Sequence, residues 1–292
     1  MQFCPRDGTA LPALPGLIAG KYEVVRELGS GGMGVVYLAN QAAIERRCAL
    51  KMLRPDAVAD PDALARFHRE ARAASRISHP NVVGVFDFGQ AEDGSAYLAM
   101  EYVDGVTLAE VLRAGPLPPR RAARIAWQVA NGLAVAHELG IVHRDLKPGN
   151  IMLTTYRSWT DFVKVVDFGI AKPVGSAATS TVTSTGLRVG TPAYMSPEQW
   201  IDGDVDPRSD QFTLALIVVE MLSGRTPPPQ PSLMMDGTTL IESVPKPAAW
   251  PEAVKQVLAR ALQRLPDDRY GAVSEFAREL VAAVNAWEPP AP

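Results

Sequence analysis

The sequence predicts an α+β fold in two parts, a small β-rich part followed by a larger α-rich part. Apolar residues alternate in short, strand-like runs up to about residue 102, with one long helical pattern among them. After residue 102 the apolar residues recur mainly at helical spacing. The chain has 292 residues, of which 47% are hydrophobic, so it can bury a large core and intrinsic disorder is excluded.

The first part is expected to contain several strand segments and one helix. The helix is predicted over 61–77, where Pro61 suits the first turn and apolar residues from Leu64 to Ile77 recur at helical spacing. A glycine cluster separates the first two strand segments and predicts a tight turn. The predicted strand segments are 22–28, 35–38, 48–53, 82–88 and 96–102.

The second part is expected to be mainly helical. Along 119–139, Ile125, Val129, Leu133 and Ala136 fall on one face of a helix. Three further segments have a helical pattern, namely 210–224, 251–264 and 272–286. The predicted organisation is a Pro- and Gly-rich leader over 1–20, a first lobe over 21–103, a second lobe over 104–287 and a tail over 288–292.

The composition excludes several classes of protein. The net charge is −3 and no basic stripe is present, so we expect no nucleic-acid partner. No apolar stretch approaches the roughly 20 residues that cross a bilayer, so no membrane contact is expected within this chain. Two cysteines exclude a disulfide scaffold and favour a cytoplasmic location.

Cys4 stands in what looks like half of a zinc knuckle. A structural zinc site needs about four ligands, and the chain has no second cysteine pair. We therefore expect the leader to be a degenerate half knuckle. Metal binding by Cys4 stays open only for an assembly of several chains.

The glycine cluster Gly29-Ser30-Gly31-Gly32-Met33-Gly34 has the spacing of a phosphate-binding loop. Glycines let backbone N–H groups approach phosphates without a Cβ in the way. A strand and not a helix follows, so the loop is expected to lie over a nucleotide, unlike a dinucleotide-binding turn. A glycine-rich hairpin without a ligand is the alternative.

Lys51 lies in the middle of an apolar strand segment. Lysine is rarely buried unless it is paired, and Glu70 on the predicted helix is the natural partner. A Lys51–Glu70 pair would hold the ammonium where it can reach phosphate oxygens. The alternative is a lysine whose charged end extends to solvent.

The most informative segment runs from His143 to Leu153. Asp145 can orient a hydroxyl and accept its proton, Lys147 can neutralise a phosphoryl group, and Asn150 can bind a metal ion through its oxygen. Asp167 ends an apolar strand segment before a glycine, where it is placed to bind Mg²⁺. The two segments together predict phosphoryl transfer.

In this order the motifs resemble those of bacterial, eukaryotic-type serine/threonine protein kinases. The resemblance covers residues 21–286 and implies a two-lobed protein kinase fold, with an ATP cleft between a small β-rich lobe and a larger helical lobe. The motifs are the glycine-rich loop 29–36, Cys-Ala-Leu-Lys at 48–51, Glu70, His-Arg-Asp at 143–145, Asn150, Asp-Phe-Gly at 167–169 and Ser-Pro-Glu at 196–198.

The resemblance implies a role for each catalytic residue. Asp145 is expected to be the base for the acceptor hydroxyl, with Lys147 near the transferred phosphate. Lys51 is expected to hold the α- and β-phosphates of ATP, and Asn150 and Asp167 to bind Mg²⁺, with Mn²⁺ as the alternative metal.

The resemblance also places an ATP site. Met100 is expected at the back of the adenine pocket, and the backbones of Glu101 and Val103 at the adenine edge. The implied ATP-binding residues are Leu28, Gly29, Ser30, Gly31, Gly32, Met33, Gly34, Val36, Ala49, Lys51, Glu70, Met100, Glu101, Val103 and Met152.

Several residues favour a protein substrate and regulation by phosphorylation. The resemblance implies that Lys147 favours Ser/Thr over Tyr acceptors and that Gly190, Thr191 and Pro192 form the substrate platform. The candidate phosphorylation sites are Thr179, Thr181, Thr183, Ser184 and Thr185, whose phosphate could pair with Arg144 and order the segment 167–198.

The remaining matches are expected to anchor the fold. Glu198 is expected to pair with Arg269, and Asp210 to open a buried helix and cap the backbone near His143. Ala74 is small where the family often has a larger apolar residue, so an activating partner, a second copy of the chain or loop phosphorylation is expected to supply the missing order. The alternatives are a nucleotide-binding pseudokinase and a small-molecule phosphotransferase.

Overall fold

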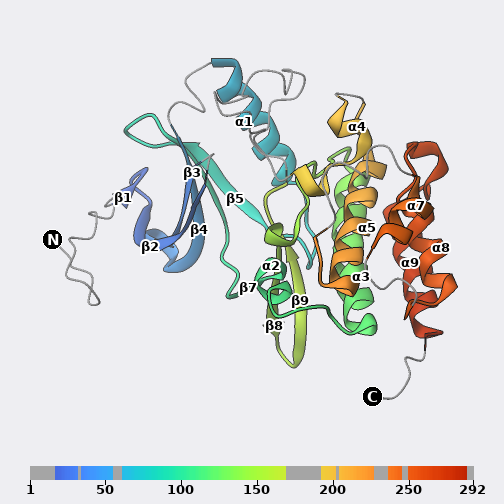
Figure 1. Ribbon diagram of the computed structural model, residues 1–292. Helices are drawn as coiled ribbons and strands as arrows, with labels where there is room; N and C mark the ends of the chain where they lie inside the picture. The colour runs from blue at the N-terminus through green and yellow to red at the C-terminus, as the bar shows by residue number, and fades with distance from the viewer. Residues whose placement is uncertain are drawn as a thin grey trace, which may run out of the picture. The chain divides into compact units, whose positions relative to one another are not determined.

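The computed structural model describes residues 17–31, 34–54, 61–168, 192–201, 204–226, 236–244 and 249–287 (Figure 1). The chain divides into two compact units. The first comprises Met1–Arg76 and Val83–Val103, and the second comprises Ile77–Val82 and Asp104–Pro292.

Residues 77–82 group with the second unit, whereas the sequence analysis placed them in the first lobe. The cause is hydrogen bonding by Asn81. Its carbonyl accepts from the Val165 N–H at 2.8 Å, and its side-chain nitrogen donates to the Val163 carbonyl at 2.9 Å. Val82 adds an isolated bridge to Val165, so the second unit positions this segment.

The first unit is built on one antiparallel sheet with the strand order β1-β2-β3-β4-β6-β5. Tyr22, Cys48, Leu50 and Tyr97 form the core on one face of this sheet. The last predicted strand pair begins later than expected, at Val85, because Val82 bonds elsewhere. The strands are β1 (Leu17–Ile18), β2 (Tyr22–Gly31), β3 (Gly34–Gln41), β4 (Arg46–Leu53), β5 (Val85–Gln90) and β6 (Ala96–Glu101).

Helix α1 (Pro61–Ala74) packs beside β5 in the same unit. Phe67 is buried, and the ring of His68 lies 5.8 Å from that of Phe88. The helix ends three residues before its predicted end. There the Ser75 hydroxyl donates to the Arg72 carbonyl at 2.9 Å, a local bond of the kind that competes with helix continuation.

Helix α5 (Pro207–Ser223) is the centre of the second unit and is buried on nearly all faces. From Phe212 to Val219 every residue but Thr213 is apolar, a pattern typical of a fully buried helix. Helices α3 (Pro119–Glu138) and α9 (Val273–Asn285) pack against it and against each other. The other α-helices described here are α2 (Leu108–Leu112), α4 (Pro197–Trp200), α7 (Gly237–Ser243) and α8 (Glu252–Ala261).

Helix α5 begins at Pro207, so the expectation that Asp210 opens it was wrong. Asp206 is the N-cap, and its carboxylate accepts from the Arg208 N–H at 2.7 Å. Pro207 follows at the first helical position, where the missing N–H costs nothing. Asp210 therefore lies within the first turn.

A second antiparallel sheet, β7-β8-β9, lies within the second unit. Its strands are β7 (Gly105–Thr107), β8 (Ile151–Tyr156) and β9 (Trp159–Val165). The β8–β9 hairpin has an irregular register next to Asp161, whose φ of 55° is rare for a non-glycine residue. The irregularity directs the Asp161 carboxylate to Arg121 and Arg124 of α3, at 2.8 Å and 3.0 Å.

Within the described part of the chain, no helix is long and apolar enough to cross a lipid bilayer.

Candidate active site

The loop 140–150, between α3 and β8, is positioned by Asp210 of α5. Its carboxylate accepts from the backbone N–H of His143 at 2.8 Å and from that of Arg144 at 3.0 Å. Nε2 of His137 lies 2.8 Å from the same carboxylate. Asp210 is buried, so all of these bonds are shielded from water, and breaking them would leave polar groups unsatisfied.

The imidazole of His143 joins this loop to the segment after β9. Its Nε2 donates to the Val166 carbonyl at 3.0 Å, and its Nδ1 accepts from the Asp145 N–H at 3.3 Å. The ring also contacts that of Phe168, with centroids 4.7 Å apart and ring planes tilted by 44°. Burial lowers the pKa of His143 despite the nearby acidic groups, so the ring is neutral at pH 7. One donating and one accepting nitrogen is the pattern that a neutral imidazole satisfies.

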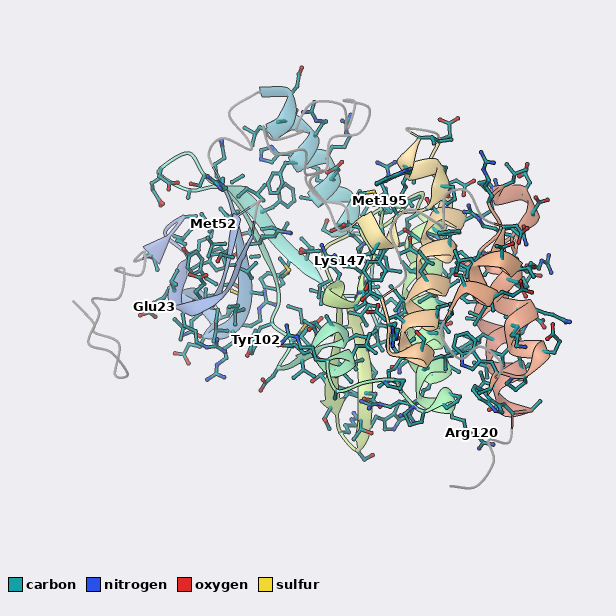
Figure 2. All side chains as sticks on the ribbon, in the orientation of Figure 1. Glu23, Met52, Tyr102, Arg120, Lys147 and Met195 are labelled. Carbon is teal, nitrogen blue, oxygen red and sulfur yellow. The ribbon has the colours of Figure 1, made fainter. Side chains whose placement is uncertain are left out.

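Asp145, Lys147 and Asn150 converge in this loop (Figure 2 labels Lys147). Lys147 Nζ lies 3.0 Å from Asp145 Oδ2, and Asn150 Nδ2 donates to the Asp145 carbonyl at 2.8 Å. The short helix η3 (Pro148–Asn150) reverses the chain and returns Asn150 to Asp145. The Asp145 side chain is 22% exposed, so the carboxylate is anchored and still open to a reactant.

Asn150 and Asp167, the expected metal ligands, are linked through the backbone. The Val166 N–H donates to the Asn150 carbonyl at 3.0 Å, and Asp167 follows at once with a φ of 58°. Asp145 accepts from the Asn150 side-chain nitrogen, so the side-chain oxygen is the end that suits a cation. Among the described residues no group of three or more His, Cys, Asp and Glu could hold a metal alone. Two side-chain oxygens completed by phosphate oxygens would suit Mg²⁺, so the residue types at these positions fit the expected metal.

In the first unit, the hairpin of β2 and β3 carries the glycine cluster. Gly29 pairs with Val36 and Gly31 with Gly34, so these glycines lie where the two strands meet. Gly34 has a φ of 153°, and a Cβ there would lie 1.9 Å from the Met52 carbonyl oxygen of β4. The close approach of the backbone to β4 therefore requires glycine at this position.

Strand β4 brings expected nucleotide-binding residues beside residues of β3 and β6. Lys51 lies opposite Val36, and Ala49 lies opposite Met100. Ala49 and Met100 are buried, which is compatible with core packing as well as with an adenine pocket. Glu70 is in α1 of the same unit, and its pairing with Lys51 stays a prediction.

Other expected ATP-binding residues lie further apart in the chain. The Glu101 N–H donates to the Gly84 carbonyl at 2.9 Å, which fixes the end of β6. Val103 is half-buried, just before the second unit begins. Met152 is in β8 of the second unit, opposite Thr107.

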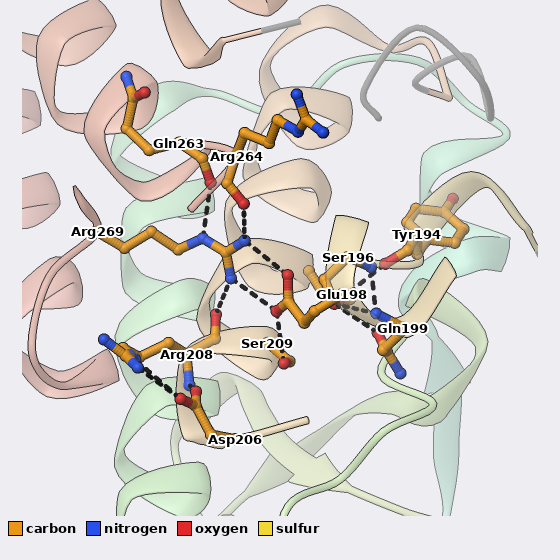
Figure 3. Close-up of polar contacts among 11 residues, drawn as sticks. Tyr194, Ser196, Glu198, Gln199, Asp206, Arg208, Ser209, Gln263, Arg264 and Arg269 are labelled. Atoms are coloured by element: carbon orange, nitrogen blue, oxygen red, sulfur yellow. Dashed lines mark hydrogen bonds and ion pairs between the residues drawn. The ribbon is translucent and has the colours of Figure 1, made fainter. Parts of the chain in front are cut away.

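Glu198 and Arg269 form the ion pair that the sequence analysis names (Figure 3). Arg269 Nη1 and Nη2 each donate to one Glu198 oxygen at 2.8 Å, and the Ser209 hydroxyl donates to Oε1 at 2.6 Å. Burial by itself would raise the pKa of Glu198, but the hydrogen bonds and charge of Arg269, together with the Ser209 hydroxyl, outweigh it and hold that pKa below its ordinary value. The pair joins α4 to the turn η6 (Pro266–Asp268).

Gln199, which follows Glu198, was not singled out from the sequence. Its Nε2 donates to the Arg144 carbonyl at 2.8 Å, and its Oε1 accepts from the Ser196 N–H at 3.1 Å. A serine with a glutamine three residues later is the signature of a capping box, so the cap could have been predicted. The bond to Arg144 is long-range and has no local signal.

The remaining predicted site residues lie outside the described residues. They are Cys4, Gly32, Met33, Gly169, Thr179, Thr181, Thr183, Ser184, Thr185, Gly190 and Thr191. Pro192 begins the turn η4 (Pro192–Tyr194), which precedes α4.

Residues 22–281 match the protein kinase domain family. The chain is 42% identical over 274 residues to serine/threonine-protein kinase pkn3 of Myxococcus xanthus, covering 91% of this chain and 50% of that protein. It is 38% identical over 287 residues to PknB of Mycobacterium tuberculosis, covering 95% and 45%. The crystal structure of the M. tuberculosis PknI kinase domain superposes with a TM-score of 0.73 at 32% identity, covering 94% of this chain and all of that one.

The chain thus spans about half the length, or less, of these curated relatives.

Proposed function

Because this chain belongs to the protein kinase family, we propose that it transfers the γ-phosphoryl group of ATP to serine and threonine hydroxyls of proteins. The family uses ATP and a divalent metal, and the relatives described above are named serine/threonine-protein kinases. The observation that carries the proposal is the convergence of Lys147 and Asn150 on Asp145.

Asp145 and Lys147 have complementary tasks in this proposal. The Asp145 carboxylate orients the acceptor hydroxyl and takes its proton. The Lys147 ammonium, 3.0 Å from that carboxylate, stabilises negative charge on the transferred phosphoryl group. Phosphoryl transfer depends mainly on positioning and charge neutralisation, so a carboxylate and an ammonium group can supply much of what the reaction needs.

Asn150 and Asp167 would hold Mg²⁺, or Mn²⁺ as the alternative, through their side-chain oxygens. The bound cation would neutralise charge on the phosphates of ATP. Lys51, paired with Glu70, would hold the α- and β-phosphates under the glycine cluster of β2 and β3. The alignment of Val36 with Lys51 in the sheet supports this arrangement.

The first lobe of the proposed enzyme is residues 21–103 without 77–82, which join the second lobe, residues 104–287. Residues 1–20 are the leader and 288–292 the tail. Ala49, Met100 and the backbone around Glu101 would form the adenine site. Gly190, Thr191 and Pro192 would form the platform for the substrate peptide. Glu198, Arg269 and Asp210 would keep these parts in place, and their buried bonds support that role.

We also propose that the enzyme phosphorylates its own segment between Asp167 and Glu198. Arg144 Nε is buried and has no hydrogen-bond partner among the described residues, so its N–H is available to donate to a phosphate group on that segment. Incubation with MgATP followed by peptide mass mapping should find phosphate on one or more of Thr179, Thr181, Thr183, Ser184 and Thr185. An active enzyme whose segment stays unmodified would refute this part. We further propose that a partner protein or a second copy of this chain activates the enzyme by ordering α1 near Ala74.

Transfer of labelled γ-phosphate to a mixed histone acceptor tests the main proposal. We expect labelled phosphoserine and phosphothreonine, but no phosphotyrosine, after acid hydrolysis of the product. ATP binding without transfer under all conditions would favour a pseudokinase. Transfer to a small molecule but to no protein would favour a small-molecule phosphotransferase.

A further inference from the structure

The peptide unit between Arg144 and Asp145 is held in a strained conformation. Arg144 has a φ of 63°, and the Asp145 N–H donates to the His143 carbonyl at 2.8 Å. A bond across two residues with a positive φ at the centre is the rare and strained form of the γ-turn. Such a conformation persists only where its surroundings hold it.

The bonds that hold this turn come from two helices. Asp210 of α5 accepts from the Arg144 N–H, on the preceding peptide unit, at 3.0 Å. Gln199 of α4 donates from Nε2 to the Arg144 carbonyl at 2.8 Å. That carbonyl belongs to the same peptide unit as the Asp145 N–H. Gln199 therefore bonds the peptide unit that leads directly to the Cα of Asp145, where the catalytic side chain is attached.

The other end of the Gln199 amide is also fixed. Its Oε1 accepts from the Ser196 N–H at 3.1 Å and from the Ser196 hydroxyl at 3.2 Å. These bonds leave the Nε2 donor directed away from the cap, and Gln199 is only half-buried. A glutamate would preserve this capping box, but it would replace the donor that faces the Arg144 carbonyl with an acceptor.

We propose that Gln199 is a positioning residue for phosphoryl transfer, because its side-chain amide holds the Arg144–Asp145 peptide unit and so aims the Asp145 carboxylate. The inference rests on the proposed kinase function and adds to it a link from α4 to the catalytic loop. Gln199 does not touch the reactants. Its loss should lower kcat and leave ATP binding nearly unchanged.

Four variants test this proposal beside the wild type, with labelled phosphate transfer from MgATP to mixed histones. All preparations are first matched in phosphorylation state by intact mass. Gln199→Glu should lower kcat about ten- to a hundredfold, a loss typical of small misplacements of reacting groups, while KM for ATP changes less than about twofold. Gln199→Met removes the donor without introducing a charge, so it should give the same loss. It serves as the second variant if the glutamate does not fold.

Ser196→Ala is the matched control. It removes the hydroxyl of the capping box, and with it the bond of 3.2 Å to Gln199 Oε1. The backbone N–H of Ser196 still donates to that oxygen at 3.1 Å and keeps Gln199 oriented. We expect a lower melting temperature with kcat within about twofold of the wild type. Asp145→Asn is the control for the function itself: if it transfers phosphate as fast as the wild type, the proposed function fails whatever Gln199 does.

The pH profile gives a readout that a purely structural role would not move. In Gln199→Glu the Arg144 carbonyl disfavours the charged form of the new carboxylate, whereas the Ser196 N–H and hydroxyl favour that form at the other oxygen. Once protonated, the new carboxyl can donate to the Arg144 carbonyl. The kcat of Gln199→Glu relative to wild type should therefore rise as the pH falls through the pKa of the new carboxyl group, whereas that of Gln199→Met should not. Folded Gln199→Glu and Gln199→Met with wild-type kcat at every pH would overturn the proposal.

Discussion

Arg269 and Glu198 are joined by two parallel hydrogen bonds of 2.8 Å each, in a site where the Arg269 side chain has no exposed surface. The other guanidinium hydrogens are used as well. Arg269 donates to the backbone carbonyls of Gln263, Arg264 and Arg208 at 2.8 Å, 3.0 Å and 2.9 Å. Every donor is thus satisfied, and the guanidinium ties α4, the start of α5 and the turn η6 together (Figure 3).

Glu198→Gln should therefore destabilise the second unit strongly. The substitution leaves a buried guanidinium without its charge partner, which costs about 3–5 kcal/mol. Arg269→Met should cost a similar amount, but the double variant should cost less than the sum of the two. Urea unfolding followed by tryptophan fluorescence measures these differences. Additive losses would contradict the coupling.

The same pair predicts a pH dependence of stability. Burial raises the pKa of Glu198, but Arg269 and the Ser209 hydroxyl together lower it further, so the folded-state pKa lies below its ordinary value. The unfolded state therefore binds the proton more readily, and the stabilisation is complete above the ordinary Glu pKa of about 4.3. It is lost as the pH falls through the lower folded-state value. The difference in free energy of unfolding between wild type and Glu198→Gln should be constant from pH 8 to 5 and shrink in more acidic buffer.

Gly34→Ala should damage the glycine loop far more than Gly29→Ala. A Cβ at Gly34 would lie 1.9 Å from the Met52 carbonyl oxygen, whereas one at Gly29 would meet no atom within 4 Å. Gly34→Ala should weaken binding of a fluorescent ATP analogue at least about tenfold, because the loop backbone must shift to relieve the clash. Displacements of about 1 Å in a binding site already have effects of that size. Gly29→Ala should change it by less than about threefold, since surface substitutions without a clash usually cost little. Equal effects of the two substitutions would show that the contact with β4 does not shape the loop.

Asp161 predicts an unequal pair of arginine variants. Arg121 donates to it from Nε at 2.9 Å and from Nη2 at 2.8 Å, whereas Arg124 makes one bond of 3.0 Å from a side chain that is 57% exposed. Arg121→Ala should cost about 1–2 kcal/mol of unfolding free energy, and Arg124→Ala about 0.5 kcal/mol or less. The pKa of Asp161 is lowered chiefly by the bonds from Arg121. Equal losses of unfolding free energy for the two variants would mean that the second hydrogen bond of Arg121 adds no stability.

The α+β protein kinase fold was predicted correctly from the sequence, because its evidence is local. The long helices 119–138 and 273–285 have apolar residues on one face, and their ends match within one residue. The start of α5 was missed since its helix is apolar on nearly all faces and gives no amphipathic signal, although the cap of Asp206 before Pro207 was readable. The short helix α2 also escaped, despite the capping box formed by Thr107 and Glu110.

In the candidate site, too, the local features could be predicted from the sequence and the long-range contacts could not. Asp145, Lys147 and Asn150 are five residues apart at most, and their convergence follows from one short loop. The contact of Asp210 with the His143 backbone is long-range and was expected only from the family resemblance. The bond from Gln199 to Arg144 spans 55 residues and its acceptor is a backbone carbonyl. Every residue has a backbone carbonyl, so the sequence contains no signal that predicts this bond.

Phosphoryl transfer by Asp145→Asn, measured beside the wild type, tests the central claim most directly. Asparagine keeps the shape of the side chain but cannot accept the hydroxyl proton, and general-base catalysis contributes about 10²–10⁴-fold. We predict a loss of that size in labelled γ-phosphate transferred to histone, with an unchanged dissociation constant for MgATP. Wild-type transfer by the variant, or no transfer by fully phosphorylated wild-type protein that binds MgATP, would contradict the assignment of a kinase centre at Asp145.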